Sequence, residues 1–215
     1  METMTRSLLS VHLLFVCAGN VCRSPLAEGL ATAWVARQVA QGSPDMRINS
    51  AGIEAAVGRE MDPKSVRALS RLGGRPPARA AKALTPEMAD EADLLLTMTR
   101  RHRRTVLEMS PRGLQRTFTL LEAADLLETA DLTGLELVPV EERARELGRR
   151  LHAQRRFRNS HAPDDIEDPL GRAQGVHDRV GETIAGALRP LVAVLLRRQP
   201  SPNVSPGAVQ ALRRA

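Results

Sequence analysis

The stretch from residue 11 to residue 25 constrains the fold of this chain more than any other. It opens with the apolar run Val11–Val16, which is short and soon followed by glycine and asparagine, so it predicts a buried β-strand. Ser24 suits a helix N-cap and Pro25 the first helical position. Beyond them, apolar residues recur at helical spacing: Leu26, Ala27, Leu30, Ala31, Trp34 and Val35. The stretch therefore predicts a strand, a tight loop and the N-terminus of a helix.

The loop between this strand and this helix has the chemistry of an anion site. Backbone N–H groups that wrap in front of a helix N-terminus point toward one place, and the helix dipole adds to their field. Cys17 opens the loop and Arg23 closes it, and both the N–H groups and the guanidinium favour the thiolate form of Cys17. A thiolate facing a phosphate-sized cradle is a nucleophile directed at phosphorus, and Arg23 can hold two phosphoryl oxygens. Ser24 offers a hydroxyl that can hydrogen-bond the sulfur and stabilise it as a leaving group.

The spacing Cys-x5-Arg-Ser is that of the cysteine-dependent phosphatases. The fuller string Val-Cys-Ala-Gly-Asn-Val-Cys-Arg-Ser-Pro, which ends at Pro25, resembles the low-molecular-weight protein tyrosine phosphatases. The alternative is a strand-turn-helix in which Cys17 is a buried structural residue, and the glycine, asparagine, arginine and serine of the loop disfavour it. The resemblance implies that Cys17 and Arg23 are catalytic. It also implies that the phosphate is bound by the whole loop: Ala18, Gly19, Asn20, Val21, Cys22, Arg23 and Ser24.

A second hallmark of that family lies late in the chain, in an acidic loop that ends in Asp168-Pro169-Leu170-Gly171. The family's Asp-Pro pattern carries the general acid, so the resemblance assigns that role to Asp168. Asp164 and Asp165 are competitors, but neither is followed by proline.

The same resemblance assigns a supporting role to Ser50, in the Ser-Ala-Gly that follows the expected second strand: it would help to hold Asn20. A serine in a turn is the alternative. Arg79 stands where the family usually carries a histidine.

The order of patterns along the chain predicts an α/β fold. Strands are expected at residues 11–16, 47–52, 92–98 and 117–120, with helices between and after them, including an amphipathic helix within 139–157 and a final helix from 176 to 195 that Pro190 disturbs. We expect a three-layer structure, a four-stranded parallel sheet flanked by helices, with the phosphate-binding loop after strand one. Residues 7–198 would form this domain, with an enlarged segment near 128–163. Residues 199–215, rich in Pro, Ser and Arg, would form a disordered tail.

Composition restricts the partners and the location. The 215-residue chain has a net charge of +6 and its basic residues are nearly all arginines. No aromatic interleaving or nucleic-acid motif accompanies this charge, so we expect an anionic substrate and no nucleic acid, and we interpret the basic run 100–104 as a solvated helix face. Both cysteines lie in the loop and no apolar run is long enough to span a bilayer, so we expect a cytoplasmic protein.

These features predict a phosphomonoester hydrolase, a protein tyrosine phosphatase that forms a phosphocysteine on Cys17 and needs no cofactor or metal. Its substrate would be a phosphotyrosine protein or another phosphomonoester. Where the family carries rim aromatics, this chain has residues such as Ile53, Ala56 and Leu170.

Three further points stay open. An arsenate reductase of the same fold that uses a small thiol cofactor is one alternative function. A phosphoprotein-binding module is another, disfavoured because a pure binder would not need Asp168. Cys22 either captures an oxidised Cys17 in a reversible disulfide or is a small apolar filler behind the loop.

Overall fold

The computed structural model describes residues 11–39, 46–159 and 162–196. At its centre lies a four-stranded sheet in the order β2-β1-β3-β4, and every neighbouring pair is parallel. The strands are β1 (Val11–Cys17), β2 (Met46–Gly52), β3 (Leu94–Thr97) and β4 (Thr117–Thr119). The predicted α/β architecture with a four-stranded parallel sheet is therefore confirmed, and the last two strands are shorter than expected.

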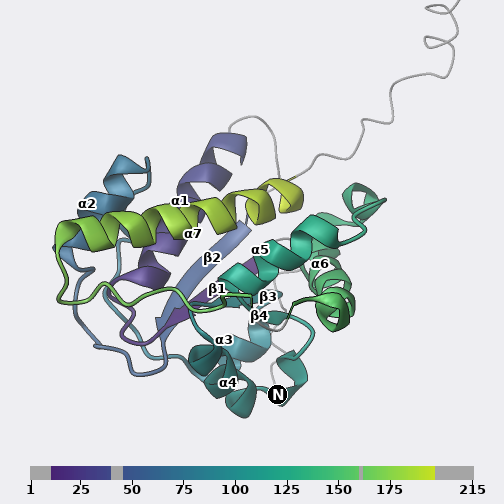
Figure 1. Cartoon of the computed structure of the whole chain (residues 1–215), viewed down its shortest axis with the longest axis horizontal. Helices are drawn as coiled ribbons and strands as arrows, with labels where there is room; N and C mark the ends of the chain where they lie inside the picture. Colours follow the sequence, from purple (N-terminus) through teal and green to yellow (C-terminus); the bar gives the residue numbers. More distant parts are fainter. Residues whose placement is uncertain (1–10, 40–45, 160–161, 197–215) are drawn as a thin grey trace, which may run out of the picture.

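Helices cover both faces of this sheet, so the domain has three layers (Figure 1). The larger layer contains α1 (Arg23–Val39), α2 (Pro63–Arg71), α5 (Leu120–Thr129), α6 (Val140–Gln154) and α7 (Gln174–Leu195). The smaller layer contains α3 (Pro86–Glu91) and α4 (Arg100–Met109). Strand β1 is buried along its whole length. Its residues alternate between the two cores, with Leu13 and Phe15 on the α1 side and Leu14 and Val16 on the α4 side.

Most helices begin where the sequence places a capping residue. Asp62, Thr85 and Thr99 each accept backbone N–H bonds at the starts of α2, α3 and α4. Helices α6 and α7 begin without a side-chain cap. Helix α1 begins at Arg23, so the expectation that Ser24 is its N-cap is wrong. The hydroxyl of Ser24 makes other contacts, described below. The final helix α7 continues through Pro190.

The enlarged segment contributes to the main core. The predicted amphipathic helix is α6, and its apolar side chains Ala144, Leu147 and Leu151 are fully buried with those of α5 and α7. Arg143, on the same helix, is 0% exposed. Its guanidinium donates to the carbonyl oxygens of Leu195, Glu136 and Val138 at 2.9, 3.1 and 3.2 Å. A buried cation therefore joins α6 to the end of α7 and to the turn before α6.

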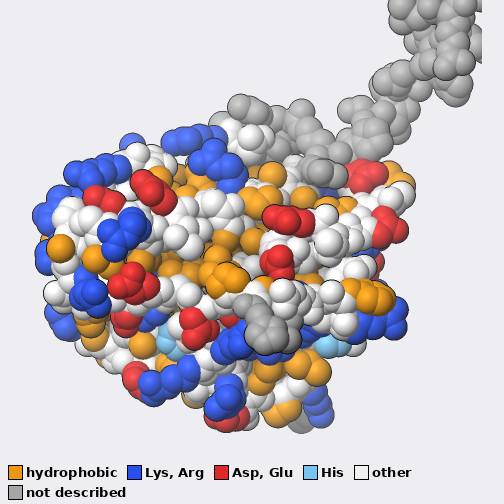
Figure 2. Space-filling model, viewed as in Figure 1, with side chains coloured by type: hydrophobic (Ala, Val, Ile, Leu, Met, Phe, Trp, Pro, Cys, Tyr) orange, Lys and Arg blue, Asp and Glu red, His pale blue; other side chains and the backbone are white. Residues whose placement is uncertain are grey.

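The surface charge is mixed on the face shown in Figure 2, where Lys and Arg side chains lie around the edge and among Asp and Glu side chains. No helix in the described ranges is both long enough and apolar enough to cross a membrane. The predicted tail, residues 199–215, lies outside the described residues, as do the first residues of the predicted domain.

Candidate active site

The loop that follows β1 wraps around the N-terminus of α1, at the carboxyl end of the sheet. Its carbonyl oxygens are held from outside by the next segment: the N–H groups of Ile53, Glu54, Ala56 and Asp62 donate to residues 17, 18, 19 and 21 at 3.0, 3.1, 3.0 and 2.8 Å. In a trans peptide the N–H points opposite to the C=O. Turning the carbonyls outward therefore turns the following N–H groups toward the inside of the loop, where an anion would sit.

Gly52 permits this close contact between β2 and the loop. A Cβ at this position would lie 2.4 Å from the carbonyl oxygen of Ala18 and 3.0 Å from the backbone nitrogen of Asn20. Atoms cannot approach so closely without a backbone shift. The glycine of the Ser-Ala-Gly sequence is thus required by packing of backbone against backbone.

Cys17 lies at the bottom of the loop and is 2% exposed. Its Sγ lies 2.9 Å from the Oγ of Ser24, which is fully buried. The Ser24 hydroxyl is therefore within hydrogen-bonding distance of the sulfur, where it can stabilise a thiolate. Cys22 is also a free, buried thiol, and burial raises its pKa to about 12.

Asn20 maintains the shape of the loop. It has a φ of 56°, the left-handed conformation that costs free energy for a residue other than glycine. Its Nδ2 donates to Ser24 Oγ at 3.0 Å and to Ser50 Oγ at 2.8 Å, and its Oδ1 accepts from the backbone N–H of Lys82 at 3.0 Å. These three bonds offset the cost of the conformation. The contact between Asn20 and Ser50 that the resemblance implied is present.

Behind Ser50 the hydrogen-bonded chain continues to an ion pair between the buried Glu28 and the half-buried Arg79. The hydroxyl of Ser50 donates to Glu28 Oε2 at 2.7 Å, and Arg79 Nη2 lies 2.5 Å from the same oxygen. Arg79 Nη1 also donates to the carbonyl of Ser50 at 3.2 Å. Burial raises the pKa of Glu28, while Ser50 and Arg79 oppose that shift. Arg79 thus supports the loop through Glu28 and Ser50, at the position where the family usually has histidine.

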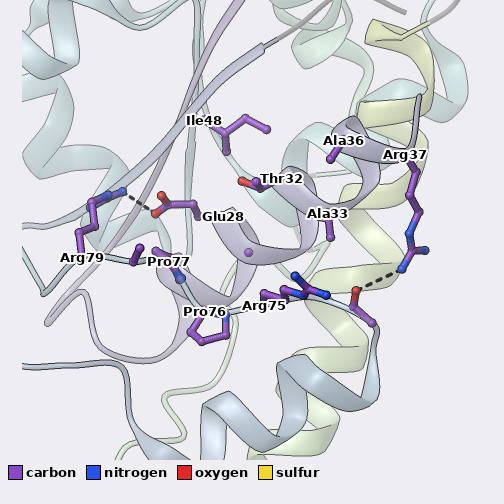
Figure 3. Close-up of a pocket in the computed structure, with 13 residues that line it drawn as sticks. Glu28, Thr32, Ala33, Ala36, Arg37, Ile48, Arg75, Pro76, Pro77 and Arg79 are labelled. Carbon is purple, nitrogen blue, oxygen red and sulfur yellow. Dashed lines mark hydrogen bonds and ion pairs between the residues drawn. The ribbon is translucent and has the colours of Figure 1, made fainter. Parts of the chain in front are cut away.

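The Glu28–Arg79 pair lies at one end of a groove of about 830 Å³ between α1, β2 and the segment 73–79. In Figure 3 the two side chains point toward each other, while Arg37 and Arg75 lie farther along the groove. The ion pair is therefore accessible from this groove, and neither of its residues lines the cavity above Cys17.

Arg23 connects the loop to the acidic segment. Its Nη2 lies 2.6 Å from Oδ2 of Asp168, and its Nη1 donates to the carbonyl of Ile166 at 2.9 Å. Its Nε is buried and has no partner among the described residues. A buried guanidinium N–H without a partner, at the end of a loop of converging amides, is suited to an anionic ligand.

The three aspartates of the acidic segment have different partners. Asp164 pairs with Arg100 at 2.6 Å and with Arg158 at 2.7 Å, while Asp165 accepts the backbone N–H of Arg100 at 2.7 Å. Asp168 alone among them lines the cavity above Cys17, and its side chain is 51% exposed. Asp164 and Asp165 therefore anchor the segment to α4, and Asp168 faces the loop.

The cavity above the loop has a volume of about 250 Å³. Cys17, Arg23 and Asp168 line it together with four side chains from the surrounding segments: Glu54, Ala56, Arg59 and Leu170. The placement of Ile53 at the rim is wrong, because Ile53 does not line this cavity and packs against the core cluster that contains Leu14 and Val16. The described cavity has no aromatic side chain in its lining.

His102 is a residue beside the site that the sequence interpretation missed. The run 100–104 is only partly a solvated face, because His102 is 4% exposed and Arg103 is half-buried. Burial and the charges of Arg23 and Arg101 lower the pKa of His102 to about 4. The spacing of His102 and Val106, which places both on one buried helix face, was the available signal.

Comparison with known proteins identifies the relatives of this fold and loop. The family model for low molecular weight phosphotyrosine protein phosphatase matches residues 12–133. The low molecular weight protein-tyrosine-phosphatase Ptp of Acinetobacter johnsonii is 34% identical over 109 residues, which are 51% of this chain and 71% of that protein. The protein-arginine-phosphatase of Bacillus subtilis (strain 168) is 30% identical over 157 residues, 68% of this chain and 100% of that protein.

Solved structures agree with these relatives. A low molecular weight protein tyrosine phosphatase from T. tengcongensis has a TM-score of 0.61 and 27% identity, covering 86% of this chain and 99% of its own. A cysteine-to-serine mutant of YwlE arginine phosphatase with a phosphorylated active-site serine has a TM-score of 0.62 and 26% identity, covering 86% and 95%. The match over more than half of the sequence and the shared fold show that this chain belongs to the low molecular weight phosphotyrosine protein phosphatase family and is a cysteine-dependent protein phosphatase.

Proposed function

We propose that Cys17 is the nucleophile, that Arg23 and the loop amides bind the phosphoryl group, and that Asp168 is the general acid. The observation that carries this proposal is the convergence on one cavity of a buried thiol, a guanidinium with an unpartnered Nε and a half-exposed carboxylate. A cysteine-dependent phosphatase needs these three functions from one site.

The reaction follows in two steps. The sulfur of Cys17 attacks phosphorus while Arg23 and the N–H groups of residues 18–24 hold the equatorial oxygens, and Asp168 gives a proton to the departing atom. Water, activated by Asp168, then cleaves the phosphocysteine, and the Ser24 hydroxyl 2.9 Å away stabilises the departing sulfur. Arg23 is paired with Asp168 in the structure, so substrate binding redirects part of the guanidinium to the phosphoryl group.

The substrate we propose is phosphotyrosine in proteins. The name of the Acinetobacter johnsonii relative supports this substrate. The apolar side chains of Ala56 and Leu170 in the cavity lining support it too, because they could pack against an aromatic ring. Phosphoarginine in proteins is the second candidate. It is favoured by Glu54 in the cavity lining, because this exposed carboxylate, paired with Arg101 in the structure, would exchange that partner for the guanidinium of the substrate. The similarity to an arginine phosphatase over that protein's full length also favours it.

Two peptides of identical sequence, one with phosphotyrosine and one with phosphoarginine, distinguish the candidates by their kcat/KM values. Glu54→Gln should lower kcat/KM for phosphoarginine several-fold and leave that for phosphotyrosine within about twofold if the second candidate holds. A kcat/KM for phosphotyrosine well above that for phosphoarginine supports the first. The same preparation, given arsenate and a small thiol, tests the reductase alternative.

The covalent mechanism is tested with Cys17→Ser. We expect this variant to lose turnover of an aryl phosphate while it still binds phosphate, because the anion site is made by backbone N–H groups and Arg23. Appreciable turnover by a pure Cys17→Ser preparation contradicts the mechanism.

A cytoplasmic location is proposed from the cysteine content, since both thiols are free in the structure.

A further inference from the structure

Behind the phosphate loop lies a cluster of three potential metal ligands that the catalytic mechanism does not use. The Sγ of Cys22, a carboxylate oxygen of Asp62 and a ring nitrogen of His177 all lie within 4.8 Å of one another. Cys22 belongs to the loop, Asp62 precedes α2, and His177 lies in the first turn of α7. No spacing in the sequence suggested this cluster, because its members come from three separate elements.

The geometry suits a small tetrahedral ion. His177 Nδ1 and Asp62 Oδ1 are 3.7 Å apart. In a tetrahedral zinc site with bonds of about 2.0–2.3 Å, the ligand atoms are roughly 3.3–3.8 Å apart. Small side-chain movements therefore convert the cluster into a coordination sphere. A thiolate, an imidazole and a carboxylate together favour Zn²⁺ over the hard cations Mg²⁺ and Ca²⁺.

The surroundings hold the three ligands in place. His177 is 1% and Cys22 is 3% exposed, while Asp62 is half-buried and leaves a path to solvent. Asp62 Oδ1 accepts the backbone N–H groups of Lys64 and Ser65 at 2.8 and 3.2 Å, which fixes the carboxylate. These bonds orient the Asp62 carboxylate, as is typical of metal sites. Ser65 Oγ lies 2.8 Å from Nδ1 of His177, so the hydroxyl would turn away when that nitrogen binds a cation.

The hydrogen-bonding capacity of His177 is not fully used by the protein. Its Nε2 is buried without a partner in the described part of the chain, and its Nδ1 contacts the Ser65 hydroxyl and the more distant Asp62 carboxylate. A buried imidazole nitrogen without a hydrogen-bonding partner lowers the stability of the folded protein unless another interaction compensates. Coordination of a cation through Nδ1 would add a strong compensating interaction to this imidazole.

We propose that Cys22, Asp62 and His177 form a binding site for a thiophilic divalent cation of the Zn²⁺ class. On binding, the Cys22 thiol releases its proton to solvent, the sulfur donates an electron pair to the cation, and no group is oxidised or reduced. A water molecule completes the coordination from the half-buried side of Asp62. The three side chains take no step in the phosphoryl transfer, although Cys22 also lines the cavity above Cys17.

Binding at this site would connect the phosphate loop to α2 and α7. The N–H of Asp62 already donates to the carbonyl of Val21 at 2.8 Å, so the loop and the start of α2 are neighbours. A cation held by Cys22, Asp62 and His177 adds a second link between them and joins both to α7. It stabilises the loop and keeps the Cys22 sulfur from reacting with Cys17.

The experiment uses the Cys17→Ser protein and Co²⁺ as a spectroscopic probe of a zinc site. The chain has two cysteines, so Cys22 is then the remaining thiol. We expect a one-to-one titration with sulfur-to-cobalt charge-transfer absorption in the near ultraviolet and intense visible bands of tetrahedral Co²⁺. Zn²⁺ should abolish both. Because Cys17 is absent, the result is independent of the proposed catalytic mechanism.

Further substitutions in the Cys17→Ser protein identify the ligands. Cys22→Ala should remove the charge-transfer band, and His177→Gln and Asp62→Asn should each weaken Co²⁺ binding by at least about tenfold. Asn is as good an N-cap as Asp, so Asp62→Asn separates loss of a ligand from loss of α2. His152→Gln, a half-buried histidine on α6, is the matched control and should bind normally. Circular dichroism checks the fold of each variant.

Two results overturn the proposal. One is the absence of a thiolate charge-transfer band in folded Cys17→Ser protein at saturating Co²⁺. The other is a band that persists with unchanged affinity in both His177→Gln and Asp62→Asn, because this would mean that Cys22 alone binds the ion.

Discussion

At the scale of single residues, the three acidic side chains 164, 165 and 168 show how one segment separates structural from catalytic carboxylates. Asp164 and Asp165 are bound to α4 by Arg100, and Asp164 also pairs with Arg158, which follows α6 in the chain. Asp168 is half-exposed beside Arg23, where a leaving group would depart. All three residues are aspartates, so their different roles follow from the partners that their carboxylates contact.

Asp168→Asn should slow hydrolysis of esters with poor leaving groups by about a hundredfold to ten-thousandfold, because such leaving groups need a proton. Activated aryl phosphates should be affected less. The measurement is kcat across a series of leaving groups, with Asp165→Asn as the control of the same chemistry in the same segment. A larger loss in Asp165→Asn than in Asp168→Asn would show that the acid has been wrongly assigned.

His102 predicts a pH dependence of stability. Its pKa is lowered from 6.5 to about 4, so the unfolded chain binds a proton at a higher pH than the folded protein does. The stability that neutral His102 contributes is present above about pH 6.5 and is lost as the pH falls toward 4. Over that window the loss is on the order of 3 kcal/mol. Urea unfolding at several pH values should show a shallower decline in His102→Gln, whereas identical slopes in the two proteins contradict the prediction.

At the scale of elements, α1, β2 and the segment before α3 meet at the Glu28–Arg79 pair, which is connected through Ser50 and Asn20 to the phosphate loop. Through these contacts, the way the three elements pack together helps to determine the shape of the phosphate loop. It also explains how the loop is held without the histidine that the family usually has at position 79.

Arg79→Ala should leave Glu28 buried with Ser50 as its remaining partner, at a cost of about 1–3 kcal/mol in the free energy of unfolding. We expect kcat to fall about tenfold, because Asn20 loses part of its support. Arg79→His should recover most of the activity. The control is Arg75→Ala, which lies in the same groove outside the ion pair. Unchanged kcat in Arg79→Ala would mean that Asn20 is held without this pair.

At the scale of the whole molecule, α6 and α7 close the main core through Arg143. Its guanidinium satisfies carbonyl oxygens from the end of α7 and from the turn before α6. These contacts lie on elements that contribute no side chain to the cavity above Cys17. Stability and catalysis should therefore respond separately to changes at this position.

Arg143→Met should lower the free energy of unfolding by about 2–4 kcal/mol, because it removes the donors from buried carbonyl oxygens. At temperatures where the variant is folded, kcat/KM should stay within about twofold of the parent value. Arg149→Met is the control, since Arg149 is exposed and pairs with Glu146 on the same helix. A large fall in kcat/KM for folded Arg143→Met would show that α6 acts on the site.

The sequence by itself determined the parts of this protein that depend on short separations along the chain. The strand, loop and helix of residues 11–39 follow from local periodicity, and the spacing of Cys17 and Arg23 follows from the geometry of a loop at a helix N-terminus. The capping residues Asp62, Thr85 and Thr99 mark helix starts for the same reason, because an N-cap bonds only the next few N–H groups.

Only the tertiary structure decided the contacts between distant segments. It pairs Arg79 with Glu28, buries His102 beside Arg23, and brings Cys22, Asp62 and His177 together. In the folded protein Ile53 packs in the core and not at the rim of the cavity, and the Ser24 hydroxyl contacts the sulfur of Cys17 and does not cap a helix. Local sequence patterns indicate which residues face a core. The hydrogen-bonding partner of each buried polar group depends instead on how whole helices and strands pack together, and this packing exists only in the folded chain.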